Sequence, residues 1–298
     1  MTKRALVCYD GSAAANAALR AGTQLLPDAH AWIAYLWTPP FAEEGLRRRL
    51  WAGRDHIEEF VEALRGEGAW RAEQVVVTGV TIARTAGWRA EALTRPTEGG
   101  EGFELARTAA ALEPDVVLIG SRGLDGFRAV LGSVSDVLVH YSPKPVLVVP
   151  YPMLMRDAAA VPGGPVVVGW DGSPGASAAV VAADRLLPER EVVLVSVHDR
   201  AEEWPSTPPP DGSRSVKPVL VRPGNGTPGH AIADALGRYA ADRSAALVVV
   251  GSRGRSAAQE IMLGSVAMAT LHHAHRPVLV VPRPHGAPAG TPAGRGAA

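Results

Sequence analysis

The chain contains the same series of short motifs twice, and this repeat limits its fold more than any other feature of the sequence. Four segments of the first half recur in the same order in the second: residues 5–12 match 166–173, 120–123 match 251–254, 132–134 match 264–266, and 145–150 match 277–282. Internal similarity of this kind indicates a duplicated structural unit. Because 298 residues suffice for two units of about 130 to 150 residues, we expect two tandem domains.

The matched segments also suggest where the domains begin and end. We place the first domain at residues 1–150 and the second at residues 165–283, with a short linker at 151–164 between them. The C-terminal segment 284–298 is rich in proline, glycine and alanine, a composition that favours a disordered tail.

Each copy begins with the pattern of a parallel βαβ unit. An apolar run ends on Asp-Gly-Ser and leads into an alanine-rich segment, in which the serine is a good N-cap and the alanines favour a helix. A second apolar run follows within about thirty residues, the spacing of a right-handed crossover between parallel strands. The strands expected in this way are 5–9, 31–37, 89–94 and a fourth ending at Gly120 in the first copy, and 166–170, 192–197, 218–222 and a fourth ending at Gly251 in the second. The helices expected later in each copy are 102–112 and 134–141, and 229–243 and 266–275.

The copies differ after their second strands. Asp10 and Gly120 are 110 positions apart, whereas Asp171 and Gly251 are only 80 apart. In the first copy, residues 43–86 predict a long helical region that breaks near residues 66–68. The run Val-Val-Val at 75–77 within it has strand propensity. The second copy has Trp-Pro, Pro-Pro-Pro and Asp-Gly-Ser between residues 199 and 217, which predict an irregular crossover.

The last strand of each copy has the sequence Pro-Val-Leu-Val-Val-Pro, which is typical of an apolar strand at a sheet edge. Exposed apolar edges invite pairing. We therefore expect the strand from Val146 to Val149 to pair with the strand from Val278 to Val281, which makes the chain an internal pseudo-dimer. A further homodimer is compatible with the sequence.

The composition argues against several classes of partner and location. Thirty basic residues balance thirty acidic ones, so no net charge draws the protein to nucleic acid or to a membrane surface. No apolar run reaches the length of a membrane span, and the N-terminus does not resemble a signal peptide. The single cysteine, Cys8, excludes an internal disulfide and favours a packing role in a reducing compartment. We expect a soluble, cytoplasmic protein.

Glycine and serine are concentrated where the fourth strand of each copy ends. Gly-Ser-Arg-Gly follows the strand, and a later Gly-Ser begins a helix, so that backbone N–H groups and a helix N-terminus face the same space. This arrangement predicts a phosphate cradle, to which Ser133, Ser135 and Ser265 add hydroxyl donors; the position of Ser135 is Ala267 in the second copy. The alternative is that the glycines only end strands and cap helices.

The aspartate that ends the first strand of each copy suggests the other part of the ligand. A carboxylate would repel phosphate, but Asp10 and Asp171 can accept hydrogen bonds from ribose hydroxyls or an adenine amine. Each aspartate can also cap the helix that follows. Walker A, nucleophile-elbow and Gly-x-Gly-x-x-Gly motifs are absent, so the sequence contains no recognised machinery for fast hydrolysis.

Three histidines, His272, His273 and His275, resemble a metal-binding group at first sight. However, His272 and His273 are adjacent and must project from different sides of a helix. We interpret them as cations that favour the C-terminal end of the helix dipole.

In combination, strand-Asp-Gly-Ser, Gly-x-x-Gly-(nine)-Gly-Ser and Pro-Val-Leu-Val-Val-Pro resemble the universal stress protein (UspA) family, here as a tandem of two domains. The resemblance implies an α/β fold of two flavodoxin-like or Rossmann-like domains. Each would have a five-stranded parallel sheet in the order 3-2-1-4-5, with helices on both faces. It also implies ATP, with or without Mg²⁺, at the C-terminal ends of the strands. The implied site residues are Asp171, Val197, Gly251, Arg253, Gly254, Gly264, Ser265 and Val266 in the second copy, and Asp10, Leu36, Gly120, Arg122, Gly123, Gly132, Ser133, Val134 and Ser135 in the first.

Two departures from the family pattern rank these sites. Only eight residues separate Gly123 from Gly132, whereas the second copy has the nine of the pattern but carries Ala267. On spacing, the second site is the better candidate. Three functions remain open: a non-enzymatic stress sensor or regulator that binds ATP and a protein partner, a slow ATPase at the same cradle, and a nucleotide-free interaction scaffold.

Overall fold

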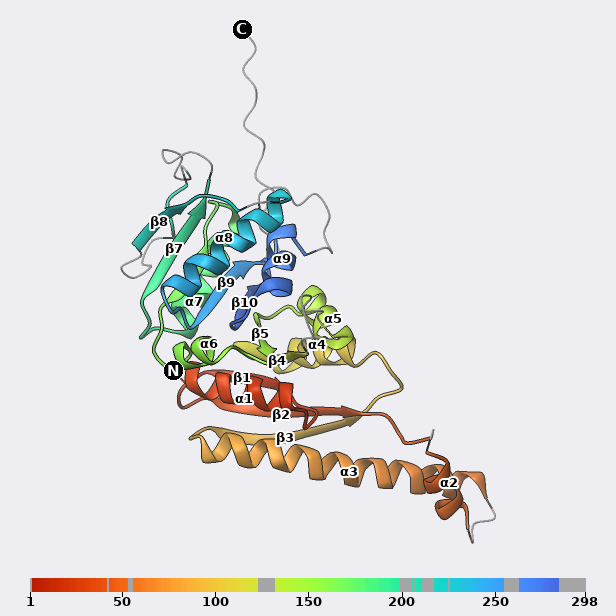
Figure 1. Cartoon of the computed structure of the whole chain (residues 1–298). Helices are drawn as coiled ribbons and strands as arrows, with labels where there is room; N and C mark the ends of the chain where they lie inside the picture. The colour runs from red at the N-terminus through yellow and green to blue at the C-terminus, as the bar shows by residue number, and fades with distance from the viewer. Residues whose placement is uncertain are drawn as a thin grey trace.

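The computed structural model describes residues 2–41, 43–52, 56–122, 132–198, 205, 207–210, 217–224, 226–254 and 263–283. Ten strands form one sheet in the order β3-β2-β1-β4-β5-β10-β9-β6-β7-β8. Each half of the chain therefore contributes five strands in the predicted order 3-2-1-4-5 (Figure 1). The expected α/β fold of two similar halves is confirmed.

The first half contains the strands and helices expected from its apolar runs, all parallel within the half. Their bounds are β1 (Arg4–Cys8), α1 (Ala13–Leu25), β2 (His30–Trp37), α2 (Glu44–Trp51), α3 (Ile57–Thr85), β3 (Arg89–Pro96), α4 (Glu101–Leu112), β4 (Val116–Arg122), α5 (Ser133–Tyr141) and β5 (Val146–Tyr151).

The second half repeats this order without counterparts of α2 and α3 among its described residues. Its elements are α6 (Met155–Ala160), β6 (Val166–Gly169), α7 (Pro174–Leu186), β7 (Val192–Val197), β8 (Lys217–Val221), α8 (Pro228–Asp242), β9 (Leu247–Gly251), α9 (Ser265–His273) and β10 (Val278–Val281).

Helices cover both faces of the sheet, so the central strands are apolar on both sides. Successive residues of a strand point to opposite faces: Val7 contributes to the core under α1 and α3, and Leu6 contributes to the core under α4 and α5. In the second half, α7 lies on the first face, and α8 and α9 lie on the second. Burial of alternate side chains on both faces explains why these strands read as continuous runs of valine, leucine and alanine.

The two halves are joined through their last strands. β5 and β10 pair antiparallel, with Val148 opposite Val278 and Val146 opposite Val280. Residues 146–149 of β5 and all four residues of β10 are buried, and the pairing removes the two apolar edges that would otherwise be exposed. The predicted pairing of the strand from Val146 to Val149 with the strand from Val278 to Val281 is confirmed.

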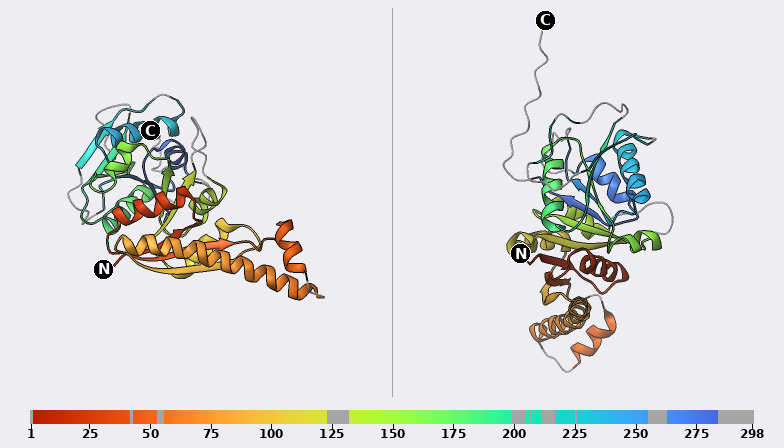
Figure 2. Two further views of the ribbon diagram at one scale, coloured as in Figure 1. Left: turned by 60° about the horizontal axis from the view of Figure 1, so that its bottom comes forward. Right: turned by 90° about the vertical axis from the view of Figure 1, so that its left-hand side faces the viewer.

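The predicted break at residues 66–68 is wrong, and residues 75–77 are helical despite their strand propensity. α3 runs without interruption from Ile57 to Thr85 and extends past the sheet together with α2 (Figure 2). Gly68 lies against the indole of Trp37, where a Cβ would come within 2.3 Å of a ring carbon. Val76 of this helix is 1% exposed, so tertiary burial outweighs its strand propensity.

The segment between the halves is more ordered than a simple linker. It contains α6, where the Oδ1 atom of the buried Asp157 accepts a hydrogen bond from the Nη2 atom of the equally buried Arg276 at 2.5 Å. Nη1 of Arg276 donates to the carbonyls of Ala240 and Ala245. This contact fastens α6 to the second half. Most of the predicted irregular crossover 199–217 and all of the predicted tail 284–298 lie outside the described residues.

Candidate functional site

Each half has a cavity at the carboxyl ends of its strands. In both halves the first strand lies between the second and fourth strands. The helix that follows the first strand and the helix that follows the fourth lie on opposite faces of the sheet. Doubly wound α/β proteins place their ligand sites at such a switch point.

The cavity of the second half has a volume of about 750 Å³. All eight residues that the sequence assigned to this site line it: Asp171, Val197, Gly251, Arg253, Gly254, Gly264, Ser265 and Val266. Apolar side chains from β7, β9 and α8 form the remaining wall, together with Trp170 and His198. A long apolar pocket with a few polar groups at one end is the usual form of a small-molecule site.

Asp171 holds the turn between β6 and α7. Its Oδ1 atom accepts a hydrogen bond from the backbone N–H of Ser173 at 2.9 Å, while the Ser173 hydroxyl caps α7 by accepting from the N–H of Ala176. The Oδ2 atom lies beside Gly254, where an added Cβ would approach it to 2.9 Å. The cap of α7 is thus Ser173 and not Asp171; the aspartate instead holds the turn before the helix and lies next to the glycine turn after β9.

Glycine at the end of the fourth strand is required by packing. A Cβ at Gly251 would lie 2.5 Å from the backbone of Gly175, and a Cβ at Gly120 would lie 2.3 Å from the carbonyl oxygen of Ala14. These two glycines allow the strand end to approach the first turn of α7 or α1. Their presence needs no ligand.

Glycine at the start of the last helix has no such internal reason. Among the described residues, a Cβ at Gly264 would come no closer than 3.4 Å to another atom, and one at Gly132 no closer than 3.6 Å, which are ordinary contacts. Neither residue has a positive φ, and serine or asparagine is as good a residue at an N-cap. Both positions face a cavity, so the missing side chain leaves room there.

The helices that begin at these glycines also lack side-chain caps. Ser12 and Ser173 cap α1 and α7, but no side chain caps α5 or α9. Uncapped N–H groups carry the partial positive charge of a helix terminus and form a ready anion site. In the first half, the Ser135 hydroxyl donates to the carbonyl of Gly132 at 2.9 Å. Ala267 occupies the equivalent position in the second half and is 2% exposed.

The cavity of the first half is smaller, about 400 Å³. It brings together seven of the nine predicted residues: Asp10, Leu36, Gly120, Gly132, Ser133, Val134 and Ser135. Arg122 ends β4, but its side chain and the whole of Gly123 lie outside the described residues.

Sequence reasoning missed one charged residue of the first cavity. Glu101, the first residue of α4, lines it, so two carboxylates share this space. Pro228 occupies the equivalent first position of α8 in the second cavity. The sequence itself shows this difference in charge, with Glu-Gly at 101–102 and Pro-Gly at 228–229. It could have been recognised once the first residues of α4 and α8 were known.

Burial shapes the titration of three groups near the first cavity. It raises the pKa of the Cys8 thiol far above its usual range, and the charge of Asp10 raises it further. The same two causes, in the same order, raise the pKa of Tyr9 and Tyr35. Cys8 is therefore an unreactive packing residue at neutral pH.

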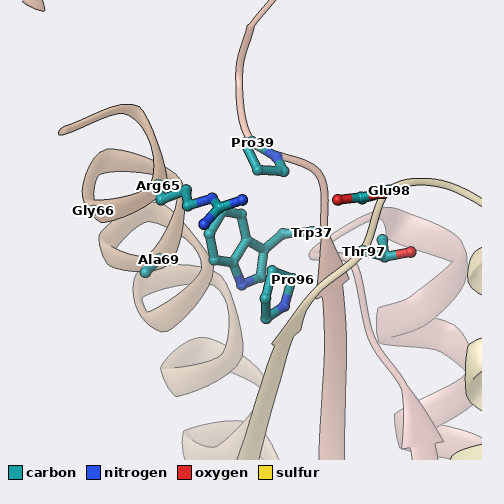
Figure 3. A pocket seen from close by; sticks show the side chains of 8 residues that line it. All are labelled: Trp37, Pro39, Arg65, Gly66, Ala69, Pro96, Thr97 and Glu98. Atoms are coloured by element: carbon teal, nitrogen blue, oxygen red, sulfur yellow. The ribbon is translucent and has the colours of Figure 1, made fainter. Parts of the chain in front are cut away.

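A third cavity, of about 510 Å³, lies between α3 and the ends of β2 and β3. Figure 3 shows the Trp37 indole between Pro39 and Pro96, with the Arg65 side chain extending toward it from α3. Glu98 is on the opposite wall. No helix begins at this cavity, so it has no resemblance to the two cradles.

Other kinds of site find no support in the described part of the chain. Its helices include none long and apolar enough to cross a membrane. Among the same residues, no group of three or more histidine, cysteine, aspartate or glutamate side chains is placed to hold a metal ion.

The fold and its two cavities define a class: a duplicated, doubly wound α/β protein with a candidate ligand site at the switch point of each half. The family model of the universal stress protein family matches residues 1–150 and 224–282, more than half of the chain. The chain belongs to the universal stress protein family.

Individual relatives agree with this assignment. Universal stress protein Rv2005c of Mycobacterium tuberculosis is 33% identical over 187 residues, covering 56% of this chain and 62% of the relative. A universal stress protein of Mycolicibacterium smegmatis is 31% identical over 196 residues, covering 59% of this chain and 65% of the relative. The matched regions thus span less than two thirds of the length of these curated relatives.

Solved structures share the whole fold at low sequence identity. A universal stress protein from Archaeoglobus fulgidus superposes with a TM-score of 0.65 and 19% identity, covering 94% of this chain and 98% of that one. A functionally unknown protein from Pseudomonas aeruginosa gives a TM-score of 0.53 and 14% identity, covering 95% and 93%. These similarities describe the fold alone.

Proposed function

We propose that the second half of this protein binds an adenine nucleotide, ATP with Mg²⁺, in the cavity of about 750 Å³ at the ends of β6, β7 and β9. The observation that carries the proposal is Gly264. Neither its backbone conformation nor any neighbouring atom of the described residues requires a glycine at this position, and no side chain in that part of the chain caps the helix that begins there and faces the cavity. A phosphate group next to the N–H groups of α9 accounts for both features.

The other residues of the cavity suit the remaining parts of a nucleotide. Arg253, Gly254 and Ser265 surround the phosphate end, whereas Asp171 can accept hydrogen bonds from ribose or from an adenine amine. The apolar wall near Val197 suits a planar base. In this proposal the protein is a stress-response sensor or regulator that responds to nucleotide and acts through a protein partner.

The first half is the weaker binding site. Its cavity is smaller, and Glu101 and Asp10 place two carboxylates where an anionic ligand would have to enter. The different loop length between Gly123 and Gly132 points in the same direction.

Calorimetry with ATP and Mg²⁺ tests the proposal through a matched pair of variants. Gly264→Asp introduces a carboxylate where phosphate would lie, and like charges in close contact cost several kcal/mol, so affinity should fall by about 100-fold or more. Gly132→Asp makes the same change in the first half and should leave the tighter binding event intact. Lack of binding of ATP, ADP and AMP at millimolar concentration would refute the proposal, as would equal losses in both variants.

Slow ATP hydrolysis at the same cradle is the enzymatic alternative. Helix N–H groups that bind a phosphate can also stabilise charge that develops during its transfer. The described residues that line the second cavity include no lysine, and their ionisable side chains are Asp171, His198 and Arg253. Phosphate release by the wild-type chain above that of Gly264→Asp would support this alternative, and equal release would exclude it.

A nucleotide-free scaffold is the remaining alternative. It is distinguished by denaturing protein purified without added nucleotide and measuring adenine absorbance in the supernatant. Bound nucleotide supports the sensor, whereas a protein that neither releases nor takes up nucleotide supports the scaffold.

A further inference from the structure

The helix pair behind the second cradle contains two histidines in contact. His230 on α8 and His273 on α9 have ring centroids 4.3 Å apart, with the ring planes at 74°. α8 and α9 lie side by side on one face of the sheet (Figure 1). The two imidazoles are therefore part of the contact between these helices.

The same positions carry a different pair in the first half. Phe103 follows Gly102 near the start of α4, as His230 follows Gly229 near the start of α8. Tyr141 ends α5, as His273 ends α9. The rings of Phe103 and Tyr141 are 4.8 Å apart. One helix–helix contact is thus built twice, once from a phenylalanine and a tyrosine and once from two imidazoles, which can take up a proton.

This contact is directly connected to the proposed nucleotide site. At the N-terminal ends of the two helices, a Cβ on Gly229 would come within 2.7 Å of the Ser265 hydroxyl oxygen. Gly229 and Ser265 both line the second cavity. A change in the separation of α8 and α9 must therefore move the N–H groups that form the cradle.

Burial and neighbouring charges favour the neutral form of His273 in the folded protein. Burial lowers the pKa of His273, and so do the charges of neighbouring histidines. The charges that act on it are His230, His272 and His275, which lower its pKa, and Asp234, which raises it. Asp234 is also bound by Arg238 at 3.0 Å. The adjoining cavity of about 330 Å³ further contains Arg156 and Asp157 of α6 and Arg276, and Arg276 is bound to Asp157.

We infer that the His230–His273 contact is a proton-sensitive element: protonation separates α8 from α9 and weakens ligand binding at the second cradle. The equivalent Phe103–Tyr141 contact contains no imidazole, and the nearby His140, whose ring lies 6.4 Å from that of Tyr141, contacts Asp136 of its own helix. The predicted loss of ligand binding rests on the proposed nucleotide function, whereas the predicted separation of α8 from α9 does not. A group whose pKa is lowered on folding stabilises the folded form above its unfolded value, about 6.5, and loses that contribution as the pH falls through the folded value.

The test exchanges the two pairs. His230→Phe combined with His273→Tyr copies the first half into the second. ATP affinity is measured by calorimetry at pH 7.5, 6.5 and 5.5 in a Gly132→Asp background, with EDTA followed by excess Mg²⁺ to remove other metals. Because phosphate itself takes up a proton near pH 6, the quantity of interest is the ratio of the two affinities at each pH.

We expect the chain with both histidines to lose about fivefold or more in affinity relative to the exchanged chain between pH 7.5 and 5.5. Equal pH profiles would overturn the inference. The reverse exchange, Phe103→His with Tyr141→His, provides a second variant and should make α4 and α5 sensitive to pH in the same range.

A readout without nucleotide separates this inference from the proposed function. Amide hydrogen exchange of α8 and α9, corrected for intrinsic rates, should accelerate at pH 5.5 in the native pair and not in the exchanged pair. No difference in exchange would overturn the inference whatever ATP does. A difference in exchange in a chain that binds no nucleotide would refute the proposed function and support the proton-sensitive contact.

Discussion

The two halves of this protein cover the same turn in different ways, and the difference shows how a duplicated fold can diverge without losing its site. In the first half, Val75 of α3 lies 3.5 Å from the position of a Cβ on Gly11, in the Asp-Gly-Ser turn. In the second half, Pro205 and Thr207 lie beside the equivalent Gly172, at 3.1 and 3.3 Å. A long helix and an irregular segment thus fill the same position.

The covering element determines which side chains can lie beneath it. Under α3, Gly79 leaves room for Tyr9 and Ile33, and Gly68 leaves room for Trp37. At the positions of Tyr9 and Trp37 the second half has Trp170 and His198, whose buried Nε1 and Nε2 atoms have no hydrogen-bond partner among the described residues. The halves therefore share the strand and glycine framework but not the packing of the face next to it.

The largest expected difference between the halves concerns Lys144 and Arg276, which occupy equivalent positions two residues before the last strand of each half. Arg276→Met should lower the free energy of unfolding by about 3–5 kcal/mol, because it leaves the buried Asp157 carboxylate without its partner. Lys144→Met changes the equivalent position of the first half. Because the ion pair of Lys144 with Glu113 is solvent-accessible, this substitution should change the free energy of unfolding by about 1 kcal/mol or less. Urea denaturation compares the two chains, and similar losses would contradict the assigned roles.

The next prediction concerns α3, the helix that distinguishes the first half. Gly68→Ala places a Cβ 2.3 Å from a ring carbon of Trp37 and should destabilise the protein by about 1–3 kcal/mol. Gly66→Ala, two residues earlier and in open space, should stabilise the helix by about 0.5–1 kcal/mol. Thermal or urea denaturation should show a loss of stability for Gly68→Ala and a gain for Gly66→Ala. If the two variants are equally stable, α3 does not lie on Trp37.

A smaller effect distinguishes Cys8 from Gly169, its equivalent in the second half. Because the pKa of Cys8 is raised on folding, its contribution to stability is complete below the unfolded value and is lost as the pH rises above it. Between pH 9 and 10 the native chain should lose about 1 kcal/mol more than Cys8→Ala. Denaturant titrations at these two pH values measure the difference, and parallel losses would refute the buried thiol.

The smallest expected effect tests the charge difference between the cavities. In a Gly264→Asp background, Glu101→Gln should raise the ATP affinity of the first half by about threefold, because it removes one carboxylate from a partly solvated site. Glu104→Gln, on the same helix but paired with Arg107, serves as the control. If both variants bind alike, Glu101 is not the reason for a weaker first site.

Much of this architecture was predictable because local patterns and the repeat agreed with each other. Residues 5–8 of β1, 116–119 of β4 and 146–149 of β5 are all apolar because both faces of the sheet are buried there, and the second copy has a similar run at each of these places. The long helix was harder, since Gly66, Gly68 and residues 75–77 oppose helix formation locally. Contacts of Gly68 and Val76 with the sheet, which no local pattern records, decide in its favour.

By itself the sequence determined the duplication, because short motifs recur in the same order in both halves. The strand order and the eight residues predicted for the second cavity followed from the resemblance of these motifs to the universal stress protein family. Only the tertiary structure decided which glycines serve packing and which leave room for a ligand, since that depends on atoms of α1 and α7 that are distant in the chain. It also decided that Glu101 enters the first cavity and that His230 meets His273. The last contact joins residues more than forty positions apart, and it exists only because two helices lie side by side on the sheet.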